Sequence, residues 1–287
     1  MFSEVAAQSV VNVLMLSSIY ILVALGFALL LTVLGILNFA HAAIYMVGGY
    51  ICYELTVDVG FNQWVSLLVS TVIMGLFGLF LEKIFFRPFL DDMNRIVVVS
   101  LALIIILQAT INVTVGSYIR RIPSFVPEVL RFGGVSISGD RLATFAIGSA
   151  LLAAVIIFIR KTKTGLQMLA ISQNSEGAAL QGIKTQRIYA VTTAIGCALA
   201  AVAGSLMGAI LSLSPFMGDI MLVKAIEIVV LAGIGSIGGV LLGGLILGAV
   251  DGILPLFMSG SATDLTGLCI IIFILLLRPQ GLFGREV

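Results

Sequence analysis

Charged residues are scarce in this 287-residue chain. Asp, Glu, Lys and Arg together make up 10% of it, whereas hydrophobic residues make up 60%. A soluble domain typically carries about 25% charged residues. The scarcity is greatest between Glu4 and Glu54, because residues 5–53 contain no Asp, Glu, Lys or Arg. This uncharged stretch is more than twice the roughly 20 residues that a helix needs to cross a bilayer. It predicts a chain whose solvent is largely lipid.

Residues and motifs that support catalysis or metal binding are also scarce. The three cysteines, Cys52, Cys197 and Cys269, lie inside apolar runs without metal-ligand spacing, and His41 is the only histidine. We therefore expect no metal site. The phosphate-binding pattern GxxxxGK[ST] does not occur, and Gly233–Gly238 matches GxGxxG only within an apolar run. With a net charge of +1 and no visible nucleophile–base set, we expect neither enzyme activity, nor a cofactor, nor nucleic-acid binding in this chain.

The apolar runs predict an all-α, polytopic transmembrane helical bundle with about eight or nine membrane segments. All six prolines lie at or between these runs, where a missing N–H costs little. Interruptions at 33–41 and 233–239 divide two long apolar regions. Irregular backbone at membrane depth needs cover by protein or a water-filled cavity, so both interruptions are predicted to line a pathway. The predicted spans are 8–32, 38–55, 63–86, 96–116, 142–160, 186–213, 217–236, 237–256 and 264–278.

Lysine and arginine are distributed unevenly among the predicted loops. They concentrate in segments 82–95 and 160–187 and in the C-terminal tail, which the positive-inside rule places in the cytoplasm. The N-terminus and the 116–141 loop are then periplasmic, and residues 1–287 form a single transmembrane domain. Neither polar loop is long enough to fold alone around a catalytic core. Any energy source for this protein is therefore expected in a partner.

The 160–187 segment has the pattern of one or two short helices outside the bilayer. Asn174 can cap the second helix, and Glu176 would lie in its first turn, beside the positive end of the helix dipole. Gly182 can end the same helix. Leu180 and Ile183 then face either a groove in a partner protein or the lipid surface.

Lys224 and Glu227 are charged residues within a predicted span. Their spacing of three places them on one helix face, so they are predicted to pair. Charges inside a membrane are costly and are usually functional. The pair is either a structural clamp or a contact for substrate. Three aspartates lie near predicted span ends, where an interfacial position would explain them; they are Asp219, Asp251 and Asp264.

Asn38, His41 and Tyr45 form a second polar group, directly after the first interruption. His41 and Tyr45 are four residues apart and would share a helix face. A lone histidine without Cys, His or carboxylate neighbours gives little support for a metal site. These residues either hydrogen-bond within the structure or contact a substrate in the pathway.

Small residues recur every four positions in two late spans. This spacing places them on one helix face, where two helix backbones can approach closely. The predicted helix-packing residues are Gly196, Ala200, Gly204, Gly208, Gly235, Gly239 and Gly243.

Taken together and in order, three motifs resemble those of branched-chain amino acid ABC permeases, the LivH-type subunit. Leu37–His41 with Met46–Tyr50 resembles the N-terminal motif of that family. Lys224-Ala225 followed by Val230–Gly239 resembles its second motif, and Arg278–Gly284 resembles its C-terminal ending.

The resemblance implies a type II-like ABC importer permease in a bacterial inner membrane. Its implied partners are a LivM-type second permease, two cytoplasmic LivG/LivF-type ATPases that bind ATP and Mg, and a periplasmic substrate-binding protein. It also implies that the 160–187 segment couples the permease to the ATPases. The implied coupling residues are Gly165, Glu176, Ala178, Ala179, Leu180, Gly182 and Ile183.

The resemblance leaves the cargo open. Ala42-Ala43 stands where relatives often carry an acidic residue, and Leu166 and Leu169 stand where they often carry arginine. The expected cargo is a branched-chain amino acid or a related small polar substrate, such as urea, an amide or a carboxylate. The alternatives are an autonomous secondary transporter or channel, and a ribose-type sugar importer permease.

Overall fold

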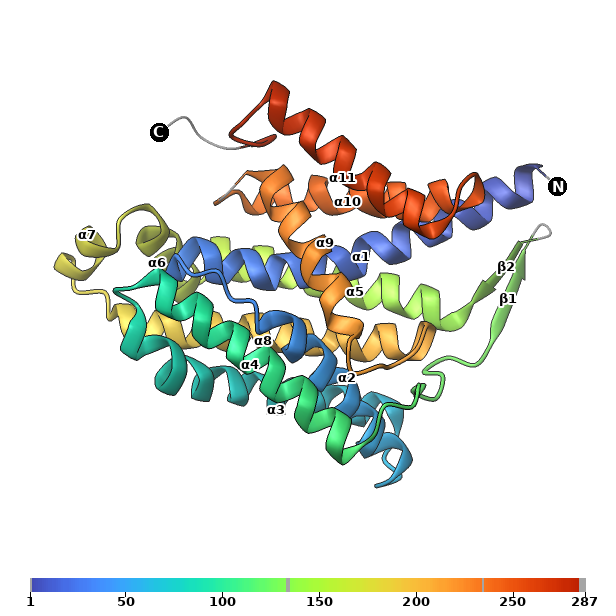
Figure 1. Ribbon diagram of the computed structural model, residues 1–287, viewed down its shortest axis with the longest axis horizontal. Helices are drawn as coiled ribbons and strands as arrows, with labels where there is room; N and C mark the ends of the chain where they lie inside the picture. The colour runs from blue at the N-terminus through green and yellow to red at the C-terminus, as the bar shows by residue number, and fades with distance from the viewer. Residues whose placement is uncertain (1, 133–134, 234, 284–287) are drawn as a thin grey trace.

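The fold is a bundle of helices that run roughly along one long axis (Figure 1). It is known from a computed structural model, which describes residues 2–132, 135–233 and 235–283. The α-helices are α1 (Phe2–Leu34), α2 (His41–Val57), α3 (Gln63–Leu81), α4 (Met93–Thr114), α5 (Gly139–Lys161), α6 (Lys163–Gln173), α7 (Ser175–Leu180), α8 (Thr185–Ile210), α9 (Met217–Ala232), α10 (Ile237–Ile253) and α11 (Gly260–Leu277).

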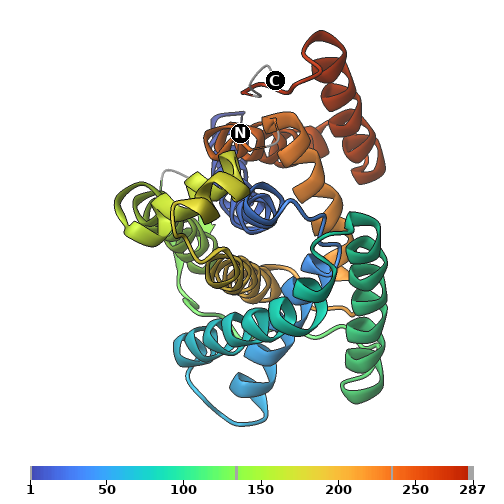
Figure 2. The same cartoon turned by 90° about the vertical axis from the view of Figure 1, so that its left-hand side faces the viewer.

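Helices α1 and α8 form the centre of the bundle, and α4 and α11 lie at its outside (Figure 2). The protein itself buries 83% of the most apolar window of α1 and 78% of that of α8, but only 17% of that of α4. Helices α2, α3, α5, α9 and α10 pack around the central pair. The outward faces of α3 and α4 carry many exposed leucine, isoleucine, valine and phenylalanine side chains, as expected of surfaces whose solvent is lipid.

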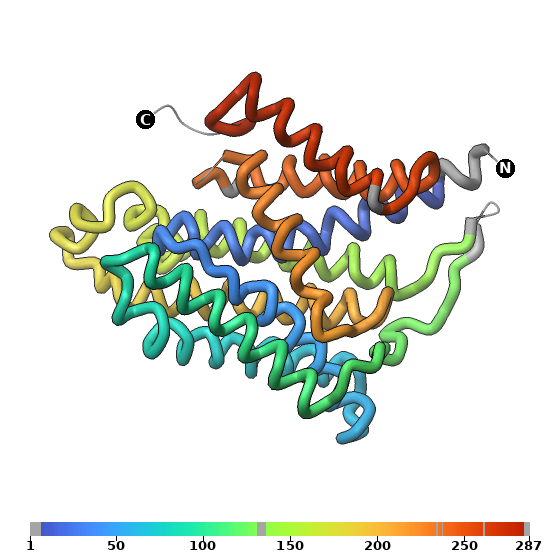
Figure 3. The backbone as a smooth tube through the Cα atoms, in the orientation of Figure 1, coloured from blue at the N-terminus to red at the C-terminus, as the bar shows by residue number. Residues whose placement is uncertain are grey.

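The predicted interruptions are present in the backbone. Six helices among the described residues are long and apolar enough to cross a membrane. Helices α2 and α9 are shorter, with 17 and 16 residues, because each borders an interruption. The chain leaves α1 at Leu34 and enters α2 at His41, and it leaves α9 at Ala232 and enters α10 at Ile237. The tube in Figure 3 shows both breaks.

The two ends of the bundle differ in structure. At one end, near the start of α1, the predicted 116–141 loop contains an antiparallel hairpin of β1 (Val129–Phe132) and β2 (Val135–Ser138), in which Val129 pairs with Ser138. No strand was predicted there. At the other end lie α6, α7 and the turn between α3 and α4 (Figure 1). The segments richest in lysine and arginine therefore share one end of the molecule.

Candidate functional site

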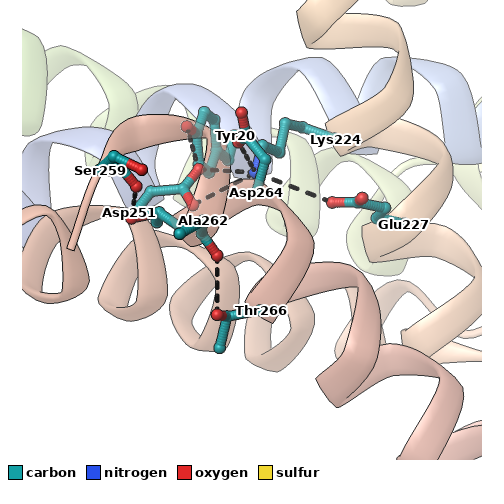
Figure 4. A network of polar contacts seen from close by, with 9 residues as sticks. Tyr20, Lys224, Glu227, Asp251, Ser259, Ala262, Asp264 and Thr266 are labelled. Carbon is teal, nitrogen blue, oxygen red and sulfur yellow. Dashed lines mark hydrogen bonds and ion pairs between the residues drawn. The ribbon is translucent and has the colours of Figure 1, made fainter.

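Lys224 is the centre of an ion-pair network inside the bundle. It extends from α9 and is 95% buried; its Nζ lies 2.9 Å from Asp251 Oδ2 and 3.1 Å from Asp264 Oδ1. Asp251 comes from α10 and Asp264 from α11, so the lysine joins three helices (Figure 4). In the apolar interior such pairs persist only when the charges are neutralised by close partners. We call this set, with Tyr20 and Glu227, the Lys224 network.

Tyr20 and Glu227 complete the network. The Tyr20 hydroxyl, from α1, donates a hydrogen bond of 2.6 Å to Asp251 Oδ2. Glu227 lies one helical turn beyond Lys224, but its Oε2 is 4.0 Å from Nζ and has no hydrogen-bond partner in the described part of the chain. The predicted pairing of Lys224 with Glu227 is therefore present, but it is the longest of the three contacts that Lys224 makes.

The network holds more acidic than basic groups. Asp251, Asp264 and Glu227 face the single cation Lys224 among the residues described at this site. The side chain of Asp264 is 66% exposed, whereas that of Glu227 is 8% exposed. The network is therefore open to the outside of the bundle at Asp264 and enclosed at Glu227. Such an arrangement can bind or release a cationic group, because an uncompensated buried carboxylate is costly.

Asp251 and Asp264, both predicted near span ends, pair with Lys224. Asp251 lies near the end of α10, yet its side chain is only 10% exposed because α1 and α9 cover it with Tyr20 and Lys224. Asp219 does lie on the surface, where its Oδ1 accepts a hydrogen bond from Gln108 at 2.7 Å. Asp251, Asp264 and Tyr20 are the partners of the Lys224 network that sequence reasoning missed.

The polar group after the first break is packed into the core. Asn38, His41 and Tyr45 are all fully or almost fully buried. The Nε2–H of His41 donates to the Val23 carbonyl of α1 at 3.1 Å, which leaves Nδ1 as an acceptor with no partner among the described residues. Both polar atoms of the Asn38 side chain likewise lack a hydrogen-bond partner within the described ranges. The structure does not bring this group into contact with Lys224 through any described polar interaction.

Small residues let the helices around this polar group approach closely. A Cβ on Gly26 of α1 would lie 2.9 Å from the Gly196 carbonyl and 2.9 Å from His41 Cε1. Gly196 itself faces Gly26 and Leu30, and Gly204 faces the Tyr45 carbonyl of α2. Ala200 and Gly208 are also buried on α8. The predicted close packing along α8 is therefore present, against α1 at one point and α2 at another.

The second predicted stripe of glycines does not form one packing face. Gly235 lies outside any helix, at φ +92°, and a Cβ there would meet nothing within 4 Å. Gly239 faces the Ala232 carbonyl, and Gly243 faces Ile228, so both pack against α9. The prediction for Gly235 is wrong because the backbone is still in the turn between α9 and α10 at that position.

A further face of α10, which carries Gly244, Gly248 and Gly252, packs against α1. Added Cβ atoms at these positions would meet Ile21, Ser17 and Val13, respectively. This contact holds α10, and therefore Asp251, against the helix that supplies Tyr20.

The C-terminal motif docks onto the break after α9. The backbone N–H groups of Leu282 and Phe283 donate to the carbonyls of Leu231 and Ala232, at 2.9 and 3.0 Å. These carbonyls belong to the last turn of α9 and would otherwise lack a partner. Gly281 makes the approach possible, because it has φ +79° and lies against Gly233. Two of the three sequence motifs are therefore in contact with each other.

The helices of the 160–187 segment form where they were predicted. Asn174 Oδ1 accepts from the Gly177 N–H at 2.8 Å and caps α7. Gly182 ends that helix with φ +83°, and the Ile183 N–H returns to the Ala178 carbonyl at 3.1 Å. The segment is thus an ordered projection from the bundle (Figure 1).

The seven residues assigned to coupling divide into two groups. Gly165 and Ala178 are buried, so they hold the projection in place; Gly165 lies against Phe158 and Ile159 of α5. The side chain of Leu180 is 88% exposed. The others that reach the surface, wholly or in part, are Glu176, Ala179, Gly182 and Ile183.

The fold and the buried charges define a class: this is a polytopic helical membrane protein with broken spans and a polar network inside the bundle. Residues 9–277 match the family model described as "Branched-chain amino acid transport system / permease component". The chain belongs to this family of membrane transport permeases. The predicted fold class and family are therefore confirmed.

Named relatives match over nearly the whole chain. The high-affinity branched-chain amino acid transport system permease protein LivH of Escherichia coli is 30% identical over 97% of this chain and 95% of the relative. The corresponding permease protein BraD of Pseudomonas aeruginosa is 31% identical, with the same coverage of both chains. The residues that match the family model include the first two motifs and every member of the Lys224 network.

Proposed function

We propose that this chain is one of two membrane-spanning subunits of an ATP-driven importer, and that its cargo is a branched-chain amino acid or a closely related small polar molecule. The observation that carries the proposal is the family match across residues 9–277, with relatives named for branched-chain amino acid transport. The likeness to these relatives extends over nearly the whole chain, so the proposal does not depend on a single motif.

The proposed partners are a homologous second permease, two cytoplasmic ATPases and a periplasmic binding protein. The α6–α7 projection supports the ATPase contact, because Leu180 and Ala179 lie exposed on an ordered helix and turn. A single exposed leucine is common on protein surfaces, so its support for an interface comes from its place on an ordered helix outside the predicted spans. The end of the bundle that carries this projection is then cytoplasmic, in a bacterial inner membrane, in agreement with the basic residues that it holds.

Transport in this proposal is alternating access driven by the partners. ATP binding and hydrolysis move the α6–α7 projection, and the broken spans α2 and α9 transmit that movement to the pathway. The Lys224 network supports a role in this step, because it joins α1, α9, α10 and α11 through one set of contacts. Asn38, His41 and Tyr45 are proposed to line the same pathway as neutral polar groups.

Co-purification tests the assembly. The tagged chain is extracted in mild detergent and the proteins retained with it are identified by mass spectrometry. The proposal predicts two ATPases and a second permease, and it predicts that Ala179→Arg loses the ATPases while Lys163→Ala, a control at the start of α6, keeps them. Recovery of a homo-oligomer without ATPases, under conditions that preserve a known ABC importer, would favour an autonomous transporter or channel instead.

A further inference from the structure

A basic groove lies beside the α6–α7 projection, outside the Lys224 network. It has a volume of about 530 Å³ and is lined by Arg87, Ile183, Lys184, Thr185, Gln186 and Arg187. Arg87 follows α3, and the other five residues lie at or just before the start of α8. We propose that this groove binds the phosphate headgroup of an anionic phospholipid.

The first argument is charge held in a fixed geometry. Arg87 donates two hydrogen bonds to the buried carboxylate of Glu82, from Nε at 3.0 Å and from Nη2 at 2.6 Å. This bidentate contact fixes the plane of the guanidinium group and leaves its remaining N–H groups free of Glu82. Lys184 and Arg187 add two exposed cations to the groove. Even with Glu82 counted against Arg87, the groove keeps an excess of positive charge.

The backbone at the start of α8 adds to this positive potential. Lys184 is the residue before the helix, and no side chain caps the first turn. The first N–H groups of a helix have no partner within it, and the helix dipole favours an anion at this end. Thr185 and Gln186, which carry two of these N–H groups, both line the groove. The basic side chains and the helix end therefore favour the same kind of ligand.

The groove lies at the ends of two candidate membrane spans, and this position favours a lipid as its ligand. Helices α3 and α8 pack side by side, and both are long and apolar enough to span the membrane. Leu76 and Phe80 of α3 and Ile84 just after it are 48–60% exposed, as expected of a helix surface that acyl chains cover. Arg87 lies directly after that apolar stretch, near the end of the candidate span Gln63–Phe89. Basic pockets between the ends of membrane helices bind anionic headgroups in this way.

A projecting partner surface is available elsewhere. Helix α7, which carries the exposed Ala179 and Leu180, projects from the end of the bundle (Figure 1), so a soluble partner has a docking surface outside the groove. We therefore assign the groove to the membrane and the exposed face of α7 to the protein partner; Ile183, counted above among the coupling residues, lines the groove. The lipid would hold the turn after α3 against the start of α8, next to the helix that carries the projection.

Native mass spectrometry of the full-length chain in detergent, titrated with phosphatidylglycerol or phosphatidylcholine, tests this assignment. The double variant Lys184→Gln/Arg187→Gln removes two cations from the groove and leaves the Arg87–Glu82 pair intact. The matched control Arg160→Gln/Lys161→Gln removes two exposed cations at the end of α5, outside the groove. Phosphatidylglycerol binding should weaken about 30-fold in the groove variant, since each basic residue near an anionic headgroup contributes several-fold.

The control variant should bind phosphatidylglycerol like the unmodified chain, and phosphatidylcholine should bind weakly to all three. Equal loss of phosphatidylglycerol in the groove and control variants would overturn the assignment. So would displacement of the lipid by inorganic phosphate at a similar concentration, which would identify a site for free anions. Unchanged lipid binding with loss of co-purifying ATPases from the groove variant would assign the groove to a protein partner.

Discussion

The bundle contains two buried polar sites, and their polar groups are stabilised in different ways. In the Lys224 network, charged side chains from three helices and a tyrosine from a fourth face one another over distances of 2.6–4.0 Å. Around Asn38 and His41 the side chains are neutral, and three of their polar atoms have no partner in the described residues. The first site is held by charge, whereas the second is held by helix packing around glycines.

The difference identifies what each site contributes. Removing the only cation described in the Lys224 network leaves its carboxylates uncompensated, so the network should be most sensitive to loss of Lys224. The Asn38 group lacks strong internal bonds, so its loss should cost little unless transport itself needs it. Stability and transport should therefore respond together at Lys224 and separately at Asn38.

The largest expected effect is that of Lys224→Met. The substitution leaves Asp251, Asp264 and Glu227 without their cation and should lower the free energy of unfolding by about 3–5 kcal/mol. Unfolding in mixed SDS micelles, followed by circular dichroism, measures it. The exchange Lys224→Asp with Asp251→Lys should recover part of the loss. An exchange no more stable than either single variant would contradict the direct pairing of these two residues.

A smaller effect separates two of the acidic partners of Lys224, Asp251 and Glu227. Asp251→Asn should cost about 1.5–3 kcal/mol, because it weakens charge-assisted hydrogen bonds from both Tyr20 and Lys224. Glu227→Gln should cost less than Asp251→Asn, because Glu227 contributes only the 4.0 Å contact and Lys224 keeps both aspartates without it. The same unfolding assay ranks the two variants. A larger cost for Glu227→Gln than for Asp251→Asn would make Glu227 the stronger partner of the lysine.

Gly26→Ala tests whether packing holds the neutral site. The added methyl group would press on the Gly196 carbonyl and on His41, at 2.9 Å from each, and overpacking of this kind costs about 1–3 kcal/mol. Gly238→Ala is the matched control, because nothing lies within 4 Å of its added methyl group. The control should be neutral or slightly stabilising. Equal thermal stability of both variants would show that close contact at Gly26 is unimportant.

Asn38→Leu should have a small effect on stability, and in the opposite direction. It replaces a buried amide without described partners by an apolar side chain of similar size, which should stabilise the fold by about 1 kcal/mol. Transport should fall nonetheless, because the proposed pathway loses its polar group. Measured together, unfolding and uptake separate the two roles. A marked loss of stability would mean that Asn38 makes a structural bond.

Local patterns in the sequence predicted much of this structure. The long apolar runs, the breaks near 35–40 and 233–236, the Asn174 cap and the Gly182 helix end depend on neighbouring residues, so they can be read from the chain. The ion pair with Asp251 could not be read in this way. Asp251 lies 27 residues after Lys224 in the sequence. The two meet only because α10 packs against α1 and α9.

Packing between distant segments also explains the other differences between the predictions and the structure. Gly235 and Gly239 share a four-residue spacing, but one lies in a turn and the other in a helix, and spacing alone does not locate the helix start. The contact between the C-terminal motif and α9 likewise joins segments that lie far apart in sequence. Interactions between distant segments are fixed by packing, and a single sequence records them only as isolated polar or small residues.

The most direct test of the central claim is uptake into proteoliposomes. The chain is reconstituted with its second permease and ATPases, and labelled leucine is added together with the purified binding protein. The account predicts uptake that needs ATP, Mg and the binding protein, and that stops with Lys224→Met. Uptake by this chain alone, driven by an ion gradient without ATP, would contradict it.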